Sequence, residues 1–139
     1  MLPALAAGVD EVASLPPLRI LAVDDVAENL ELLQLVLARH GHQVVTAAGG
    51  ADAVAAYCRQ AFDLVLMDVQ MAGVDGLEAT RRIRQWEAAR QLATVPVIAL
   101  TASVLSQDRE DAEAAGMNGF ATKPVDPPAL LAEMARVLG

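Results

Sequence analysis

The chain has 139 residues, of which 55 % are hydrophobic and 20 % are charged. This length suits one domain, which would bury roughly two thirds of the surface of its unfolded chain, and it excludes two full domains. The 18 acidic and 10 basic side chains give a formal net charge of -8, so we expect neither nucleic acid nor a membrane surface as a direct ligand.

Residues 1–17 are set apart from the rest of the chain by the pair Pro16-Pro17. The first nine positions are apolar, but they carry no basic residue and run into Asp10 and Glu11, which is not the pattern of a signal peptide. No apolar run approaches the ~20 residues that span a bilayer. We therefore expect 1–17 to be a linker or a cloning remnant and 18–139 to be one domain. The single cysteine, Cys58, cannot form an intramolecular disulfide, which fits a reducing cytoplasm.

The first half of the domain alternates between strand-like and helical segments. An aliphatic run at 18–23 predicts a strand, and the apolar residues that follow at helical spacing predict a helix that Gly41 ends. A β-branched run at 43–47 predicts the second strand. Gly49-Gly50 then lead into an alanine-rich helix that extends to about residue 59.

The second half repeats the alternation three times. The predicted strands are 64–67, 95–100 and 119–122, and the predicted helices run from about 77 to beyond 86, from 106 to 115 and from 127 to 138. We expect Ser106 to cap the fourth helix and Asp126 to cap the last one. Asp75 is most simply the cap of the third helix.

Five strand-helix units in sequence predict an α/β fold with a parallel sheet between two layers of helices, because each crossover must be right-handed. The first, third and fourth strands are the most apolar, so we place them at the centre, where both faces are covered. This favours the strand order 2-1-3-4-5 of flavodoxin-like, doubly wound three-layer folds.

Polar residues follow four of these strands directly. Asp24 and Asp25 follow the first strand, Asp68 the third, Thr101 the fourth and Lys123 the fifth. Because parallel strands all end at the same edge of the sheet, these side chains are expected to line one crevice there. An isolated aspartate at such a position would be read as a helix cap or a solubilising charge, but five polar residues in the same relation to strands indicate a site.

Three carboxylates at this spacing require a cation, since two unit charges ~4 Å apart repel by about 4 kcal/mol at an effective dielectric of ~20. Mg²⁺, which takes oxygen ligands, is the expected ion, with Mn²⁺ as a second option. Metal, carboxylate, hydroxyl and ammonium groups together favour phosphoryl transfer. Asp68 is the best-placed nucleophile because it ends the central strand, and Ala102 leaves the approach open.

The segments VDDVAEN, LVLMDVQMAGVDGLEATRRIR, VPVIALTAS and GFATKPVDPPAL resemble the receiver domain of two-component response regulators and hybrid histidine kinases, over residues 18–138. The resemblance implies that Asp68 accepts a phosphoryl group from phosphohistidine. It implies that Asp25, Asp68 and the main-chain carbonyl of Gln70 bind Mg²⁺ directly and that Asp24 holds it through water. It further implies that Thr101 and Lys123 bind the phosphoryl oxygens.

The same resemblance places Phe120 at the aromatic switch position and makes the Lys123-Pro124 bond cis. Two departures stand out: Ala72 replaces a proline found in many relatives, and Phe120 replaces tyrosine, so no hydroxyl can report the buried state of the ring. The fourth helix, 106–115, contains no Leu, Ile, Val, Met or aromatic residue and is therefore expected to be weakly anchored. We expect phosphorylation to draw in Thr101 and Phe120 and to shift the face formed by the fourth helix, fifth strand and last helix.

The expected partner is a histidine kinase or a histidine phosphotransfer domain, and we favour the receiver of a hybrid kinase, on the cytoplasmic side of a membrane-bound parent, over a free-standing shuttle. Such a domain speeds its own phosphorylation and slow dephosphorylation and turns over no metabolite. The alternative is an interaction module that keeps the fold but signals without phosphorylation. A haloacid dehalogenase phosphatase is disfavoured because Gln70 replaces its second aspartate, and a flavodoxin because the first loop is acidic.

Other residues receive ordinary structural roles. His40 and His42 flank Gly41 and are expected at the surface, and Asp63 is expected at the opposite end of the sheet from the acidic residues. Trp86 is expected to pack or to face a partner, and Cys58 to be inert. Three arginines, at positions 81, 82 and 84, are expected to form a solvated face.

Overall fold

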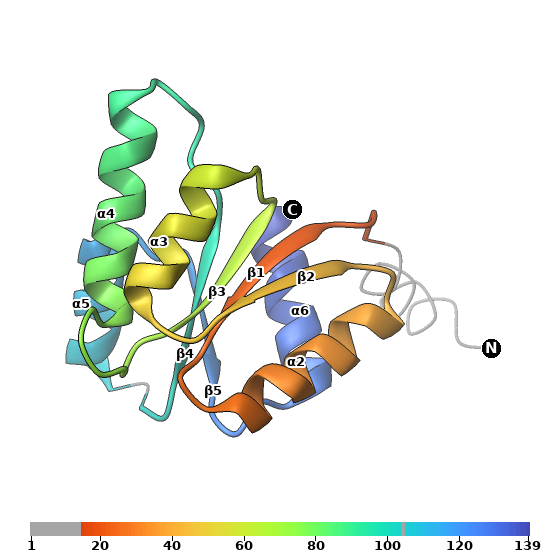
Figure 1. Ribbon diagram of the computed structural model, residues 1–139. Coiled ribbons are helices and arrows are strands. Elements are labelled where there is room, and N and C mark those ends of the chain that lie inside the picture. The colour runs from red at the N-terminus through yellow and green to blue at the C-terminus, as the bar shows by residue number, and fades with distance from the viewer. Residues whose placement is uncertain (1–14, 104) are drawn as a thin grey trace.

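The computed structural model describes residues 15–103 and 105–139, in which five strands alternate with five helices (Figure 1). In chain order these are β1 (Arg19–Val23), α2 (Ala27–Arg39), β2 (Gln43–Ala47), α3 (Gly50–Arg59), β3 (Leu64–Asp68), α4 (Gly76–Ala89), β4 (Val97–Thr101), α5 (Ser106–Ala115), β5 (Gly119–Thr122) and α6 (Pro127–Leu138). All strand pairs are parallel and the sheet order is β2-β1-β3-β4-β5. The predicted α/β fold and its strand order are confirmed.

The sheet has a separate hydrophobic core on each face. On one face, side chains such as Leu21 and Val65 pack under α3, α4 and α5; on the other, Ile20 and Leu66 pack under α2 and α6. Because neighbouring residues of a strand point to opposite faces, burial on both sides requires strands that are apolar throughout. The three central strands β1, β3 and β4 meet this requirement, as their near-complete burial shows.

The predicted boundaries agree closely with the observed ones. Those of β2, α5 and β5 coincide, while β3 and β4 extend one residue further, to include Asp68 and Thr101. The fourth strand begins at Val97 rather than at 95, since Pro96 has no N–H to donate to a neighbouring strand. Residues 1–14 of the predicted linker lie outside the described residues.

Two of the three predicted helix caps are confirmed. Asp75 accepts a hydrogen bond from the Glu78 N–H at 2.9 Å, and Asp126 accepts one from the Ala129 N–H at 3.2 Å. Ser106 was the wrong cap for α5: it is the first helical residue, and Leu105 precedes it without a side-chain cap. The hydroxyl of Ser103 lies over this end instead, donating to Asp108 at 2.6 Å and accepting from the Leu105 N–H at 3.4 Å.

The surface position predicted for His42 is wrong. The residue is only 6 % exposed, and its Nδ1 accepts a hydrogen bond from the Leu18 N–H at 3.1 Å. The turn after α2 folds the ring against the start of β1, where an N–H at the strand's end needs an acceptor. Burial of the ring, assisted by the charge of nearby His40, lowers the pKa of His42.

The solvated face predicted for the three arginines is confirmed for Arg81 and Arg82 and wrong for Arg84. The side chain of Arg84 is 17 % exposed and donates two hydrogen bonds, at 3.1 and 2.8 Å, to the carbonyl oxygen of Gly116. It also forms an ion pair at 2.9 Å with the buried carboxylate of Glu87. Arg84 thus ties α4 to the turn between α5 and β5.

None of the described helices combines the length and apolar character that crossing a bilayer requires.

Candidate functional site

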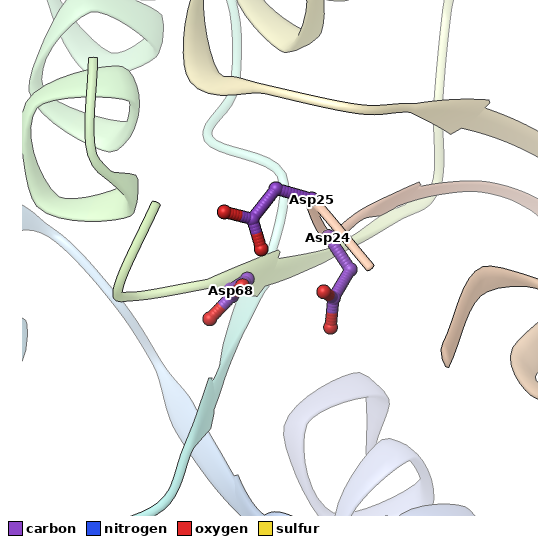
Figure 2. A group of neighbouring side chains, drawn as sticks. All are labelled: Asp24, Asp25 and Asp68. Carbon is purple, nitrogen blue, oxygen red and sulfur yellow. The ribbon is translucent and has the colours of Figure 1, made fainter. Parts of the chain in front are cut away.

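The carboxyl ends of the central strands bring three aspartates together. Asp24 follows β1 and donates its N–H to the Ala47 carbonyl of β2 at 3.2 Å, while Asp68 is the last residue of β3. Carboxylate oxygens of Asp24, Asp25 and Asp68 lie within 4.8 Å of one another, and Figure 2 shows the three side chains grouped around the end of β3. The predicted convergence of these residues at one edge is therefore present in the fold.

Lys123, which follows β5, reaches across to two of these carboxylates. Its Nζ lies 3.1 Å from Asp24 Oδ2 and 3.0 Å from Asp68 Oδ1. Burial by itself would lower the pKa of Lys123, but hydrogen bonding to Asp68 and Asp24 outweighs it and raises that pKa. One ammonium group among three carboxylates leaves the cluster anionic.

The oxygens of Asp24 are fully engaged by the chain itself. Oδ1 accepts from the Val26 N–H at 2.9 Å, and Oδ2 accepts from the side-chain amide of Asn29 at 3.1 Å. These donors come from the turn and first helical residues after β1, so the VDDVAEN segment both supplies the acid and fixes its orientation. The role of Asn29 was not predicted, although the residue belongs to the quoted segment.

Asp68 is different, because only one of its oxygens is engaged. Oδ1 accepts from the Gln70 N–H at 3.1 Å and contacts Lys123, whereas Oδ2 is buried and has no hydrogen-bond partner. Among the described residues, this is the buried side-chain oxygen or nitrogen that is left unsatisfied. Burial, reinforced by the nearby charge of Asp24, raises the pKa of Asp68 despite the opposing effect of Lys123. Such an oxygen is costly to bury and is poised to bind a cation or an electrophile.

Thr101 lies at the end of β4 next to this cluster, but its hydroxyl is engaged elsewhere. It donates to the Ser103 carbonyl at 2.9 Å and accepts from the Ser103 N–H at 3.1 Å. Thr101 shares a small cavity of about 50 Å³ with Gln70 and Phe120. The structure therefore places Thr101 and Phe120 beside each other, with open space between them and α5.

Phe120 is held from two sides in ways that the sequence did not reveal. The guanidinium of Arg109, on α5, lies 5.0 Å from the centre of the ring, and the main-chain N–H of Phe120 donates to Glu133 of α6 at 2.9 Å. Both contacts join segments that are distant in sequence, so no local pattern could have indicated them. The Lys123-Pro124 peptide bond is cis, as the resemblance implied.

The donor set fits Mg²⁺. It consists of hard carboxylate oxygens, it is anionic, and it includes one buried oxygen without a partner. Asp25 and Gln70 also line an open depression of about 520 Å³, so the cluster can be reached from solvent.

Comparisons with known proteins agree with this geometry. The family model of the response regulator receiver domain matches residues 20–135. The chain is 46 % identical over 115 residues to the sensor protein GacS of Pseudomonas syringae pv. syringae, covering 79 % of this chain but only 13 % of GacS. This chain thus spans about an eighth of that relative's length.

Two solved structures show the same fold. The receiver domain of sensor histidine kinase PA1611 from Pseudomonas aeruginosa, solved with a magnesium ion coordinated in its active site cleft, is 38 % identical, with a TM-score of 0.78 over 89 % of this chain and 99 % of that one. The Saccharomyces cerevisiae receiver domain of Ssk1, solved with the histidine phosphotransfer protein Ypd1, is 32 % identical, with a TM-score of 0.80 over 83 % of this chain and 84 % of that one. The chain belongs to the family of response regulator receiver domains.

Proposed function

We propose that this receiver domain accepts a phosphoryl group from a phosphohistidine onto Asp68. The observation that carries the proposal is the buried Oδ2 of Asp68, which has no hydrogen-bond partner, whereas both oxygens of Asp24 and Oδ1 of Asp68 are engaged. Transfer forms an O–P bond at the carboxylate and breaks the P–N bond of the phosphohistidine, whose imidazole takes up a proton from water. Catalysis then rests on positioning and on neutralising charge.

The carboxylates of Asp24, Asp25 and Asp68 and the main-chain carbonyl of Gln70 would hold Mg²⁺, Asp24 through water. The bound ion supplies positive charge for the phosphoryl oxygens. Lys123, already 3.0 Å from Asp68 Oδ1, binds one of these oxygens, and the hydroxyl of Thr101 leaves Ser103 to bind another. The same groups position water for the slow hydrolysis that returns Asp68 to its free carboxylate.

Intact-mass analysis after incubation with acetyl phosphate and Mg²⁺ tests this function. The expected result is a gain of one phosphoryl group that disappears in Asp68→Asn or when the ion is chelated. Asp75→Asn is the matched control, since Asp75 lines the same depression but caps α4, a role that asparagine fills equally well. No mass gain, or a gain that persists in a folded Asp68→Asn variant, would instead support an interaction module that works without phosphorylation.

The consequence of phosphorylation is a shift of the face formed by α5, β5 and α6. Thr101 moves toward the phosphoryl group, Phe120 packs into the cavity beside it, and α5 follows because only Ala112 and Ala115 of that helix are buried. Reversing a 1:99 population requires about 5.5 kcal/mol of differential stabilisation, so a partial shift is expected. Amide chemical shifts of α5 should change when beryllofluoride and Mg²⁺ are added; unchanged shifts would contradict the switch.

The phosphoryl donor is a histidine kinase or a histidine phosphotransfer domain, and the setting is the cytoplasmic receiver of a hybrid kinase. The likeness to GacS and to a receiver solved with Ypd1 supports this choice. Phosphotransfer from a panel of purified phosphohistidine proteins should show rapid transfer from one or a few of them. Uniformly slow transfer from the whole panel would contradict the donor class while leaving acetyl phosphate chemistry intact.

A further inference from the structure

A second hollow lies at the other end of the sheet from the aspartates. It is a cavity of about 400 Å³ between the carboxyl-terminal ends of α3 and α4, next to the segments that lead into β3 and β4. Figure 1 shows these two helix ends together on the side of the molecule away from the ends of β3 and β4 that carry Asp68 and Thr101. Its volume falls within the range of roughly 300–1,000 Å³ that is usual for small-molecule sites.

Most of the aromatic residues of the chain line this cavity. The sequence holds two Phe, one Tyr and one Trp, and Tyr57, Phe62 and Trp86 all face the hollow. Tyr57 stacks on Phe62 with ring centres 6.1 Å apart and meets Trp86 edge-on at 5.8 Å, so the walls are held in place. Leu92, 49 % exposed, extends the apolar surface at the rim. An apolar body of matching size would displace water from these walls.

The charge at the rim is positive, in contrast to the chain as a whole. Among the described residues that line the cavity, Arg59 carries the only charge. Arg90 is not one of the lining residues, but its guanidinium lies 4.5 Å from the centre of the Trp86 ring, which does line the cavity. Two helix carboxyl termini contribute about half a negative charge each, which leaves the two arginines in excess by roughly one unit.

Two acids that adjoin residues lining the cavity, Asp63 next to Phe62 and Glu87 in contact with Tyr57, are already engaged. Asp63 accepts from the Arg19 N–H at 2.8 Å, at the start of β1. Glu87 is buried and accepts from Tyr57, from the Val95 N–H and from Arg84. The rim can therefore attract an anion without first displacing an internal ion pair.

We propose that this cavity binds a small amphiphilic carboxylate, with an aromatic or alkyl body among Tyr57, Phe62 and Trp86 and the carboxylate at Arg59. The apolar walls and the cationic rim select for a ligand that has both parts. The site lies at the edge opposite Asp68, so its ligand does not compete with phosphorylation.

The chain carries its own reporters for this site, because its single tryptophan and its single cysteine both line the cavity. Titration with 4-phenylbutyrate should shift the emission of Trp86 and saturate with a dissociation constant on the order of 1 mM, as expected for a ligand of this size. The uncharged matched ligand, 4-phenylbutyramide, should bind about fivefold more weakly, since a partly exposed ion pair contributes up to about a factor of five. Bound 4-phenylbutyrate should also slow the alkylation of Cys58 by iodoacetamide.

Variants separate the charge from the hydrophobic walls. Arg59→Gln should lower the affinity for 4-phenylbutyrate to that for the amide and leave binding of the amide unchanged, and Arg81→Gln, an exposed arginine elsewhere on α4, should change neither. Equal binding of acid and amide by the wild-type protein, or an unchanged affinity in a folded Arg59→Gln variant, would overturn the proposal. It would also be overturned if only an acidic peptide with a leucine anchor, and neither small ligand, shifted Trp86 emission, because the cavity would then be a protein-docking surface.

Discussion

The three aspartates of the site all lie at the ends of strands, but they differ in their hydrogen bonds and in their exposure to solvent. Asp24 has both oxygens satisfied by the chain, Asp25 is exposed, and Asp68 has one buried oxygen without a partner. The sequence predicted which residues meet at the edge, because every parallel strand ends there. It could not predict which oxygen stays unsatisfied, since that depends on where Lys123 and the Gln70 N–H lie in three dimensions.

Gly76 packs closely against the end of β3 that carries Asp68. A Cβ at this position would lie 2.0 Å from the Asp68 carbonyl oxygen, whereas a Cβ at Gly49 would meet nothing within 4 Å. Gly76→Ala should therefore destabilise the domain by about 1–3 kcal/mol and slow phosphorylation of Asp68, because the end of β3 must move. Gly49→Ala should cost less than about 1 kcal/mol, the loss of a good helix cap residue. Urea denaturation and acetyl phosphate labelling check both, and similar effects from the two variants would contradict the steric argument.

His42 gives the domain a pH-dependent stability. Its pKa is lowered by burial and by His40, so the folded state keeps the ring neutral where the unfolded chain, with a pKa near 6.5, takes up a proton. The stabilisation is complete above about pH 6.5 and is lost as the pH falls through the folded pKa. The urea concentration at the midpoint of unfolding should be lower at pH 5.5 than at pH 7.5. This decrease should be smaller in His42→Gln, whereas His40→Gln should keep most of it. An unchanged pH dependence in His42→Gln would exclude His42 as its source.

At the scale of elements, α5 shows both what the sequence predicted and what it missed. The weak anchor was predicted from the lack of large apolar residues and is confirmed, because only Ala112 and Ala115 are buried. The contact between Arg84 and the carboxyl-terminal end of α5 was not predicted. Gly116, with a φ of 105°, ends this helix, and its carbonyl oxygen accepts a hydrogen bond from Arg84. Helical spacing indicated this contact, because Arg84 follows Thr80, which is buried, by four residues and so lies on the same side of α4. The group of nearby arginines instead favoured the prediction of a solvated face.

The contacts of Arg84 and Arg82 predict unequal contributions of these two arginines to the free energy of unfolding. Arg84→Gln leaves the Glu87 carboxylate buried without its cation, which should cost about 3–5 kcal/mol of unfolding free energy. Arg82→Gln removes an exposed pair with Glu78, 46 % and 44 % exposed, and should cost less than about 1 kcal/mol. Combining Arg84→Gln with Glu87→Gln should cost less than the two single changes together. Urea unfolding of the four variants measures this, and additive losses would show that the pair is not coupled.

In the molecule as a whole, the alternation of strands and helices places acidic and basic side chains at opposite edges of the sheet. Helix amino termini lie at the edge where strands end, and their first turns carry Glu28, Asp52, Glu78 and Asp108. Arg39, Arg59 and Arg136 occupy last turns at the opposite edge. The strand order was predicted from the hydrophobicity of three strands together with the known order of flavodoxin-like folds. The aromatic cavity was not predicted, because Tyr57, Phe62 and Trp86 come together only after α3 and α4 pack on the sheet.

The acidic edge should increase the affinity of the domain for Mg²⁺ beyond what its direct ligands provide. Glu28 lies in the first turn of α2, three residues beyond Asp25, and would act on a bound ion through mostly aqueous space. One charge about a Debye length, ~10 Å, from a divalent ion corresponds to about a twofold effect at ~0.1 M salt. Titration calorimetry should therefore show Glu28→Gln binding Mg²⁺ about twofold more weakly than the wild type at that salt concentration. The difference should vanish near 1 M KCl, where the Debye length falls to about 3 Å. Glu113→Gln, on the last turns of α5, removes the same charge far from the ion and should have no effect at either salt concentration. Equal losses of Mg²⁺ affinity in Glu28→Gln and Glu113→Gln would mean that the net charge of the domain sets the affinity, and not the position of each charge in the fold.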